Sequence, residues 1–154
     1  MLSVRWQRAP LSGAGATTSG GRWNRTGQAA LYLSADHGTA VAEFHQSLVR
    51  PGTLVGYDVH ADMIADLTSP AIFDRFSADP AIAGCEWRKI AMIDRVEPPT
   101  WALADQLADA GAQGVLFPSQ QQAGGVNLVL WRWSSAPGDG AMVHTVDPTG
   151  DLAA

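Results

Sequence analysis

Short segments in which apolar and polar residues alternate predict several strands, because successive side chains of a strand point to opposite faces of a sheet. In residues 29–34, for example, Leu31 and Leu33 share one side and Tyr32 lies on the other. Strands are also expected at residues 2–8, 53–59, 114–118 and 127–133, and a last strand at 142–146 is expected to pair at a sheet edge.

Apolar residues at helical spacing follow the strand at 29–34. Val41, Phe44 and Leu48 recur at positions i, i+3 and i+7, so they form one stripe along a helix. Ser34 is expected to cap this helix, which begins at Ala35 and ends before the next proline. The helix is therefore predicted to bury this stripe.

A second helix is predicted over residues 101–110, after a pair of prolines that interrupts the chain. Thr100 is expected to cap it and Gly111 to end it. Leu103 and Leu107, one turn apart, are expected on its inner face.

The remaining long segments give weaker signals. Residues 60–97 have no clear periodicity, and only short helices are expected there. Residues 11–21 are rich in glycine, serine and threonine, which predicts a flexible loop that holds no helix. The order of elements, with strands at both ends and helices between them, predicts a single α+β domain over residues 1–154 with a mainly antiparallel sheet.

The composition fits one folded domain. Of the 154 residues, 46% are hydrophobic and 16% are charged, which supplies an apolar core and excludes a charge-rich disordered chain. The net charge of −5 disfavours nucleic-acid binding, because proteins that neutralise phosphates present a basic face. Cys85 is the single cysteine, so no intrachain disulfide can form, as is usual in a reducing compartment.

Two further classes of protein are disfavoured. No apolar run is long enough to span a bilayer, and the first residues lack a secretory apolar segment, so a cytoplasmic protein without membrane contact is expected. The four histidines form no metal-ligand motif, and no metal site is predicted.

Three residues between positions 20 and 46 have the chemistry of a site that cleaves a dinucleotide. Arg22 lies in a glycine-flanked loop, and a guanidinium binds diphosphate oxygens through paired charge-assisted hydrogen bonds. Tyr32 offers a ring on which nicotinamide or adenine can stack. Glu43, on the predicted helix, would stabilise the positive charge that develops on ribose as nicotinamide leaves.

A second group of polar residues lies between two predicted strands. Ser119 follows the first strand, Gly124 and Gly125 permit a close approach of the backbone to a ligand, and Asn127 begins the second strand. Ser119 would donate a hydrogen bond to a phosphate or to a ribose hydroxyl. It lacks the G-x-S-x-G setting of a serine-hydrolase nucleophile.

Each of these residues also has an ordinary structural interpretation. Arg22 would be a solvated loop arginine, and Tyr32 would pack against a second layer of the structure. Glu43 lies off the apolar stripe, so periodicity alone makes it a surface carboxylate. Ser119, after a proline at a strand end, would be a turn residue.

Together the segments resemble the RES-domain family, which is named for an arginine, a glutamate and a serine. The matching pieces are GRWN at 21–24, LYLS at 31–34, AVAEF around Glu43, and the GV-x-x-PS and GG-x-N-LVLW segments of 114–131. They cover residues 5–133 in the family's order, and residues 134–154 form a C-terminal strand and tail. The chain is most similar to the ParT-like branch. It departs from the family at Gln120 and Gln121, near which many members have a basic residue.

The resemblance implies a fold like that of ADP-ribosyltransferases, NAD as the substrate and a toxin neutralised by an Xre-like or ParS-like antitoxin. By position, Arg22, Tyr32, Glu43 and Ser119 match the family's functional residues, and Arg8 matches a further arginine. The expected catalytic residues are Glu43, Arg22 and Tyr32, and the expected NAD-binding residues are Arg8, Arg22, Trp23, Tyr32, Ser119 and Asn127.

Three functions remain open at this point. Attack on the ribose by a protein nucleophile would make the chain an ADP-ribosyltransferase, for which the enzyme that makes phosphoribosyl pyrophosphate is one candidate target. Attack by phosphate or water would make it an NAD phosphorylase or glycohydrolase. A non-catalytic module would hold a nucleotide or a protein partner in its glycine-rich loops and release no nicotinamide.

Overall fold

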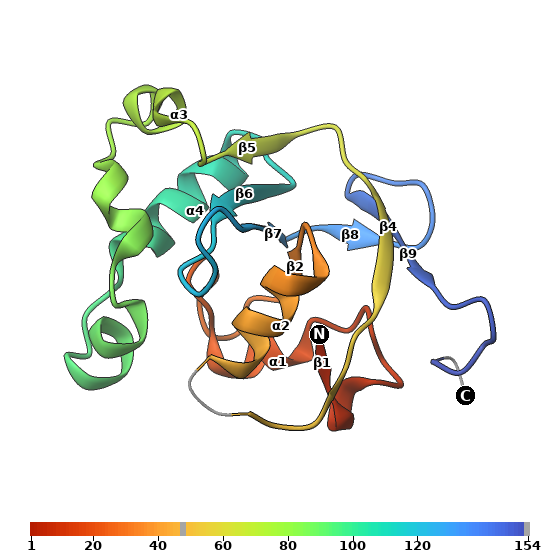
Figure 1. The fold of residues 1–154 in the computed structure, drawn as a ribbon. Coiled ribbons are helices and arrows are strands. Elements are labelled where there is room, and N and C mark those ends of the chain that lie inside the picture. Colours follow the sequence, from red (N-terminus) through yellow and green to blue (C-terminus); the bar gives the residue numbers. More distant parts are fainter. Residues whose placement is uncertain (47–48, 153–154) are drawn as a thin grey trace.

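A computed structural model of the chain describes residues 1–46 and 49–152. A four-stranded sheet runs through its centre in the order β2 (Leu31–Ser34), β7 (Val126–Leu130), β6 (Gly114–Pro118) and β5 (Ile64–Asp66). β7 is antiparallel to both of its neighbours, and β5 is parallel to β6. The helix α2 (His37–His45) follows β2 and lies next to it (Figure 1).

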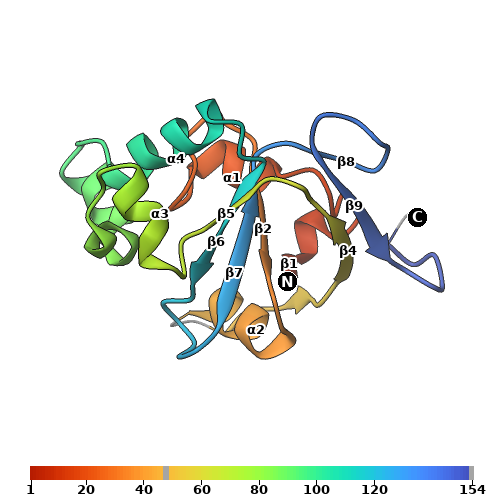
Figure 2. The same cartoon turned by 90° about the horizontal axis from the view of Figure 1, so that it is seen from above.

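A second sheet covers one face of the first. It has the order β4 (Gly56–His60), β9 (Ala141–Val146) and β8 (Trp133–Ser134), with β9 antiparallel to β4 and parallel to β8. The helices α3 (Pro70–Arg75) and α4 (Pro99–Asp109) lie on the other side of the central sheet (Figure 2). This layered arrangement confirms the α+β class and the mainly antiparallel pairing.

The alternation of side chains along β7 divides the core into two clusters. Val129 points towards α4 and packs with Val115 and Leu107, and all three are almost completely buried. Leu130 points the other way and packs with Val143 of the second sheet. β7 is thus covered on both faces, which agrees with the continuous run of apolar residues from Leu128 to Trp131.

The helix α2 exists, but its predicted boundaries and buried stripe are wrong. Asp36 caps it in place of Ser34, because the Asp36 carboxylate accepts hydrogen bonds from the backbone N–H of Thr39 at 2.9 Å and from its hydroxyl at 2.6 Å. Val41 is exposed, whereas Thr39 and Ala40 are buried. Leu48, the third member of the predicted stripe, lies outside the described residues. The helix therefore turns a more polar face inward than its apolar spacing indicated.

The segment predicted as a flexible loop contains α1 (Ala14–Ser19). Gly13 and Gly20 flank this helix with φ angles of 60° and 68°, which a glycine adopts without strain. Inside the helix, the hydroxyls of Thr17 and Thr18 donate to the carbonyls four residues earlier, at 3.2 and 3.0 Å. The glycines at 11–21 thus end a short helix instead of preventing one.

Several predicted strands are shorter or differently placed. Of residues 2–8, only β1 (Leu2–Ser3) is a strand; it pairs with β3 (Gly52–Thr53), and a 3₁₀ turn (Val4–Trp6) follows it. The segment 53–59 is divided between β3 and β4, and the segment 127–133 between β7 and β8. β9 is the middle strand of its sheet and not an edge strand.

The helix α4 has the predicted inner face, since Leu103 and Leu107 are buried. It begins at Pro99, so Thr100 lies inside the helix and does not cap it. Gly111 follows the helix with a φ of 97°, which confirms the predicted end. No helix in residues 1–46 or 49–152 combines the length and the hydropathy needed to cross a membrane.

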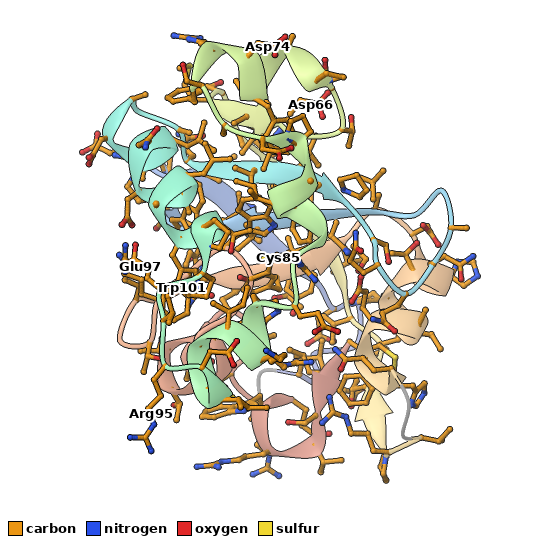
Figure 3. The ribbon with its side chains drawn as sticks, turned by 90° about the vertical axis from the view of Figure 1, so that its left-hand side faces the viewer. Asp66, Asp74, Cys85, Arg95, Glu97 and Trp101 are labelled. Carbon is orange, nitrogen blue, oxygen red and sulfur yellow. The ribbon has the colours of Figure 1, made fainter. Side chains whose placement is uncertain are left out.

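The region 60–97 contains the expected short helices and also the strand β5, which was not predicted. After α3 come a 3₁₀ helix (Pro80–Gly84) and a π-helical turn (Lys89–Ile93). This segment passes across one side of the molecule between α3 and α4, and Cys85 lies near the middle of that side (Figure 3).

Candidate functional site

A pocket of about 440 Å³ opens between α1, β2, α2 and the segment that contains residues 87 and 88. Its volume lies within the range of small-molecule binding sites. Arg22, Tyr32 and Glu43 all line it, as does Asn127. The structure therefore brings the three residues that were predicted to share a cleft to one cavity.

A tight turn presents Arg22 to the pocket. Gly21 and Asn24 pair across this turn, with the backbone N–H of Gly21 donating to the Asn24 carbonyl at 3.0 Å. The buried Asn24 amide holds the turn from inside by donating to the carbonyls of Ala16, Arg25 and Gln28 at 2.9–3.1 Å. We name residues 21–24 the arginine turn.

The Arg22 guanidinium is anchored by one of its nitrogens. Nη1 donates to the carbonyls of Ala83 at 2.8 Å and Cys85 at 2.7 Å. Within residues 1–46 and 49–152, Nε and Nη2 have no hydrogen-bond partner and so keep their donors for a ligand. Burial lowers the pKa of Arg22, and the nearby Cys85 and Glu43 partly offset this by favouring its charged form. An arginine remains protonated under such conditions.

Tyr32 holds the arginine turn to the central sheet. Its hydroxyl accepts a hydrogen bond from the backbone N–H of Trp23 at 2.9 Å and donates one to Asn24 Oδ1 at 2.9 Å. Its ring packs edge-on against Phe117. Burial raises the pKa of Tyr32 far above its usual value, so the phenol stays neutral and does not act as a base. The predicted stacking role remains a prediction, with the ring placed at the pocket wall.

Glu43 is fixed by two hydrogen-bond donors from outside its helix. Its Oε1 accepts from Ser119 Oγ at 2.7 Å and from Asn127 Nδ2 at 2.7 Å. Asn127 in turn accepts through Oδ1 from Ser34 Oγ at 2.8 Å. In the described part of the chain the second carboxylate oxygen, Oε2, has no partner. One oxygen therefore orients the carboxylate while the other is available to a ligand.

Ser119 lies behind the carboxylate and does not line the pocket. Besides donating to Glu43, its hydroxyl accepts from the backbone N–H groups of Gln121 at 3.1 Å and Gln122 at 3.0 Å. This is the local bonding of a serine in a turn. Because its proton is directed at Glu43, Ser119 orients the carboxylate. Its hydrogen bond to a phosphate or a ribose hydroxyl remains a prediction.

Trp23 and Arg8 are not at the pocket. Trp23 is completely buried and packs against Phe117 in the core. Trp23 therefore supports the arginine turn from the core and has no surface that a ligand in the pocket could contact. Arg8 is exposed and is absent from the pocket lining, so the structure gives it no contact with a ligand bound there.

Several lining residues were not identified from the sequence. Arg50 and Arg88 add two cations to the pocket, Ser34 supports Asn127, and Trp87 and Phe44 contribute aromatic rings. Arg88 lies in the region without clear periodicity, and no local motif marks it. Ser34 was interpreted as a helix cap, which hid its role on β2.

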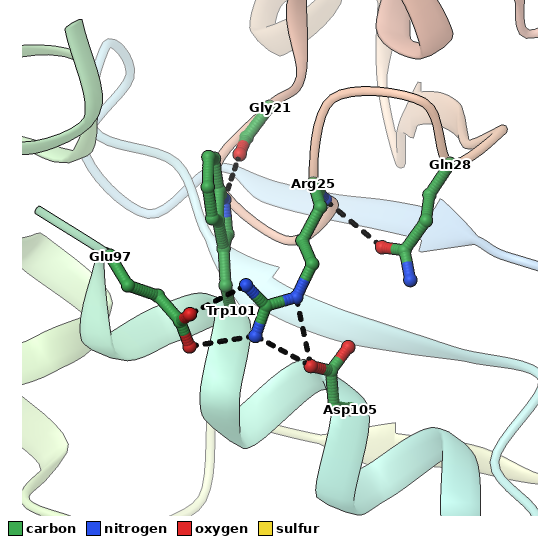
Figure 4. Close-up of polar contacts among 6 residues, drawn as sticks. All are labelled: Gly21, Arg25, Gln28, Glu97, Trp101 and Asp105. Atoms are coloured by element: carbon green, nitrogen blue, oxygen red, sulfur yellow. Dashed lines mark hydrogen bonds and ion pairs between the residues drawn. The ribbon is translucent and has the colours of Figure 1, made fainter. Parts of the chain in front are cut away.

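A cluster of charges outside the pocket secures the arginine turn (Figure 4). Arg25 binds Glu97 with two hydrogen bonds of 2.7 Å and Asp105 with bonds of 2.9 and 2.7 Å. Its guanidinium lies over the Trp101 ring at 5.6 Å, and Trp101 Nε1 donates to the Gly21 carbonyl at 2.8 Å. The turn is thus held from the pocket side by Tyr32 and from the outside by α4.

Comparison with known proteins identifies the family. The family model described as RES domain matches residues 2–153, nearly the whole chain and more than the span of 5–133 expected from the motifs. No curated protein matches the chain. The chain belongs to the RES-domain family, a domain associated with toxins that use NAD.

Proposed function

We propose that this chain is the toxin of a type II toxin–antitoxin pair and that it cleaves the nicotinamide–ribose bond of NAD, passing ADP-ribose to a protein acceptor. The observation that carries the proposal is the pairing, in one pocket, of a fixed Glu43 carboxylate with the partly free guanidinium of Arg22. Family membership supports the use of NAD.

The chemistry assigns one task to each residue. As the bond between ribose C1 and the nicotinamide nitrogen breaks, its electron pair leaves with nicotinamide, and positive charge develops on the ribose. Glu43 stabilises this charge, as carboxylates do in glycoside cleavage. Arg22 holds a diphosphate oxygen through its free donors. Tyr32, at the pocket wall, limits the position of the nicotinamide or adenine ring of the substrate. An acceptor hydroxyl or amine then bonds to C1 and loses its proton.

The nature of the acceptor is tested with NAD labelled in its adenylate phosphate. The purified protein is incubated with this NAD and a bacterial lysate, and Glu43→Gln serves as the inactive reference. Label on a protein band supports transfer, and the enzyme that makes phosphoribosyl pyrophosphate is the first acceptor to test. Soluble ADP-ribose or its phosphate, with no labelled protein, would contradict transfer and indicate degradation. Absence of nicotinamide release would leave a non-catalytic binding module.

The proposed partner is an antitoxin of the Xre-like or ParS-like class. A toxin of this kind is expected to arrest bacterial growth when expressed alone, and co-expression of the antitoxin is expected to restore growth. If wild type and Glu43→Gln slow growth equally, NAD cleavage is not the cause of toxicity.

Ser119→Ala is expected to lower the rate of nicotinamide release at saturating NAD by about 10- to 150-fold, because a hydrogen bond to a charged group contributes about 1.5–3 kcal/mol. The Michaelis constant for NAD is expected to stay within about twofold of wild type, since Ser119 orients Glu43 and lies outside the pocket lining. Steady-state kinetics measure both constants.

Two variants serve as controls. Ser119→Thr, which keeps the hydroxyl, should recover activity, and Ser135→Ala, at an exposed serine, should change neither constant. A raised Michaelis constant with an unchanged turnover would instead mean that Ser119 binds the substrate.

A further inference from the structure

We propose that Arg88 and Arg22 form a two-sided clamp for the diphosphate of the substrate, each guanidinium binding one phosphate. The inference deepens the proposed function and rests on it for the identity of the substrate. It names the diphosphate as the group by which the pocket recognises its ligand.

The first support is that, among the described residues, the arginines of the pocket lack carboxylate partners. Arg22, Arg50 and Arg88 all line it, and in the described ranges none of them forms an ion pair with a carboxylate. Their guanidinium groups donate hydrogen bonds only to neutral carbonyl or amide oxygens of the described residues. Arg25, by contrast, lies outside the pocket and binds two carboxylates. In a chain with a net charge of −5, this local excess of cations indicates a site for an anion.

The second support is that two contacts orient Arg88, an exposed residue, before any ligand binds. Its Nη1 donates to Gln46 Oε1 at 2.9 Å, and its guanidinium lies over the Trp87 ring at 5.1 Å. Gln46 ends α2 with a φ of 48°, a left-handed conformation that is uncommon for residues other than glycine. Its backbone N–H donates to the Ala42 carbonyl at 2.8 Å, which fixes the residue that supports Arg88. A preorganised guanidinium loses less freedom when it binds a phosphate.

The third support is the effect of the two arginines on each other. Burial is the main cause of the lowered pKa of Arg22, and the charge of Arg88 adds a smaller contribution in the same direction. Two cations on one pocket repel each other, and a ligand with two phosphates removes that repulsion. A ligand with one phosphate brings less negative charge to the two guanidiniums than a diphosphate does. The clamp therefore predicts a preference for diphosphates over monophosphates.

The experiment measures the binding of ADP and AMP by calorimetry, because neither ligand can be cleaved by the proposed reaction. Wild type is expected to bind ADP more tightly than AMP. Arg88→Gln is expected to weaken ADP binding by about tenfold to thirtyfold, the effect of losing one charge-assisted contact, and to leave AMP binding within about threefold. Arg88→Lys should recover part of the loss, because lysine restores the positive charge but cannot form the paired hydrogen bonds of a guanidinium.

Arg95→Gln is the matched control, since it removes the same charge from an exposed arginine that extends away from the molecule (Figure 3). It should leave both affinities unchanged, and thermal unfolding should show that all variants remain folded. Unchanged ADP binding in Arg88→Gln, an equal loss for ADP and AMP, or no ADP binding by wild type would each overturn the clamp.

The failure of the clamp and the failure of the proposed function are distinguishable. If wild type shows the Arg88-dependent preference for ADP but releases no nicotinamide from NAD, the clamp stands and NAD cleavage does not. If Arg88→Gln cleaves NAD with an unchanged Michaelis constant, NAD cleavage stands and the clamp does not.

Discussion

Glu43→Gln is expected to reduce nicotinamide release from NAD by about 10²–10³-fold, the usual effect of removing one electrostatic stabiliser of a transition state. The glutamine amide has the size of the carboxylate, and its oxygen can still accept from Ser119 and Asn127, as Glu43 Oε1 does at 2.7 Å. The side chain should therefore keep its position and lose only its charge. Chromatographic detection of nicotinamide at saturating NAD measures the effect.

Glu86→Gln provides the control, because Glu86 is exposed and does not line the pocket. Its activity should equal that of wild type. Calorimetry with ADP should show that Glu43→Gln still binds this ligand, which separates a loss of chemistry from a loss of the pocket. If Glu43→Gln keeps more than a third of the activity, the carboxylate does not stabilise the charge on ribose.

Gly21→Ala is expected to impair both stability and activity, because the arginine turn has no room for a methyl group. A Cβ at Gly21 would lie 2.6 Å from Asn24 Oδ1 and 2.7 Å from Tyr32 Cζ, and it would meet the Tyr32 hydroxyl. These atoms belong to side chains that hydrogen bonds hold in place, so the turn must move. Overpacking of this kind costs about 1–3 kcal/mol in the free energy of unfolding.

The displaced turn carries Arg22 with it, so turnover at a fixed NAD concentration should fall at least about tenfold, since one lost charge-assisted contact is worth about 1.5–3 kcal/mol. Thermal unfolding and nicotinamide release measure the two effects. Gly138→Ala is the matched control, because a Cβ there meets no atom within 4 Å. A Gly21→Ala protein that unfolds at the wild-type temperature would show that the turn accommodates the methyl group and does not require glycine at position 21.

The strands around the pocket could be predicted because their alternation is local. β2 and β6 follow directly from the pattern of apolar residues. The inner face of α2 could not be predicted in the same way. Its apolar spacing selected Val41, which is exposed, while the helix buries Thr39 and turns Glu43 towards Ser119 and Asn127, far along the chain.

The candidate site was predictable where a motif marked it and hidden where tertiary contacts alone create it. Arg22, Tyr32 and Glu43 lie within a short stretch of sequence whose residue types suggest one chemistry. Arg88 reaches the pocket only because the segment after α3 folds back beside Gln46. Trp23 was misjudged because a neighbour of Arg22 in sequence need not be its neighbour in the pocket, and the Trp23 side chain is buried in the core.

β2 links the two halves of the site through a single run of four residues. Tyr32 and Ser34 are two positions apart and so point the same way; the first bonds the arginine turn and the second reaches Glu43 through Asn127. Among the strands of residues 1–46 and 49–152, β2 is an edge strand that pairs only with β7, with Tyr32 opposite Val129 and Ser34 opposite Asn127. Fraying of β2 would remove the support of the Arg22 guanidinium and of the Glu43 carboxylate at the same time. The proposed activity should therefore be lost in an all-or-none manner, with no half-assembled site populated on the way.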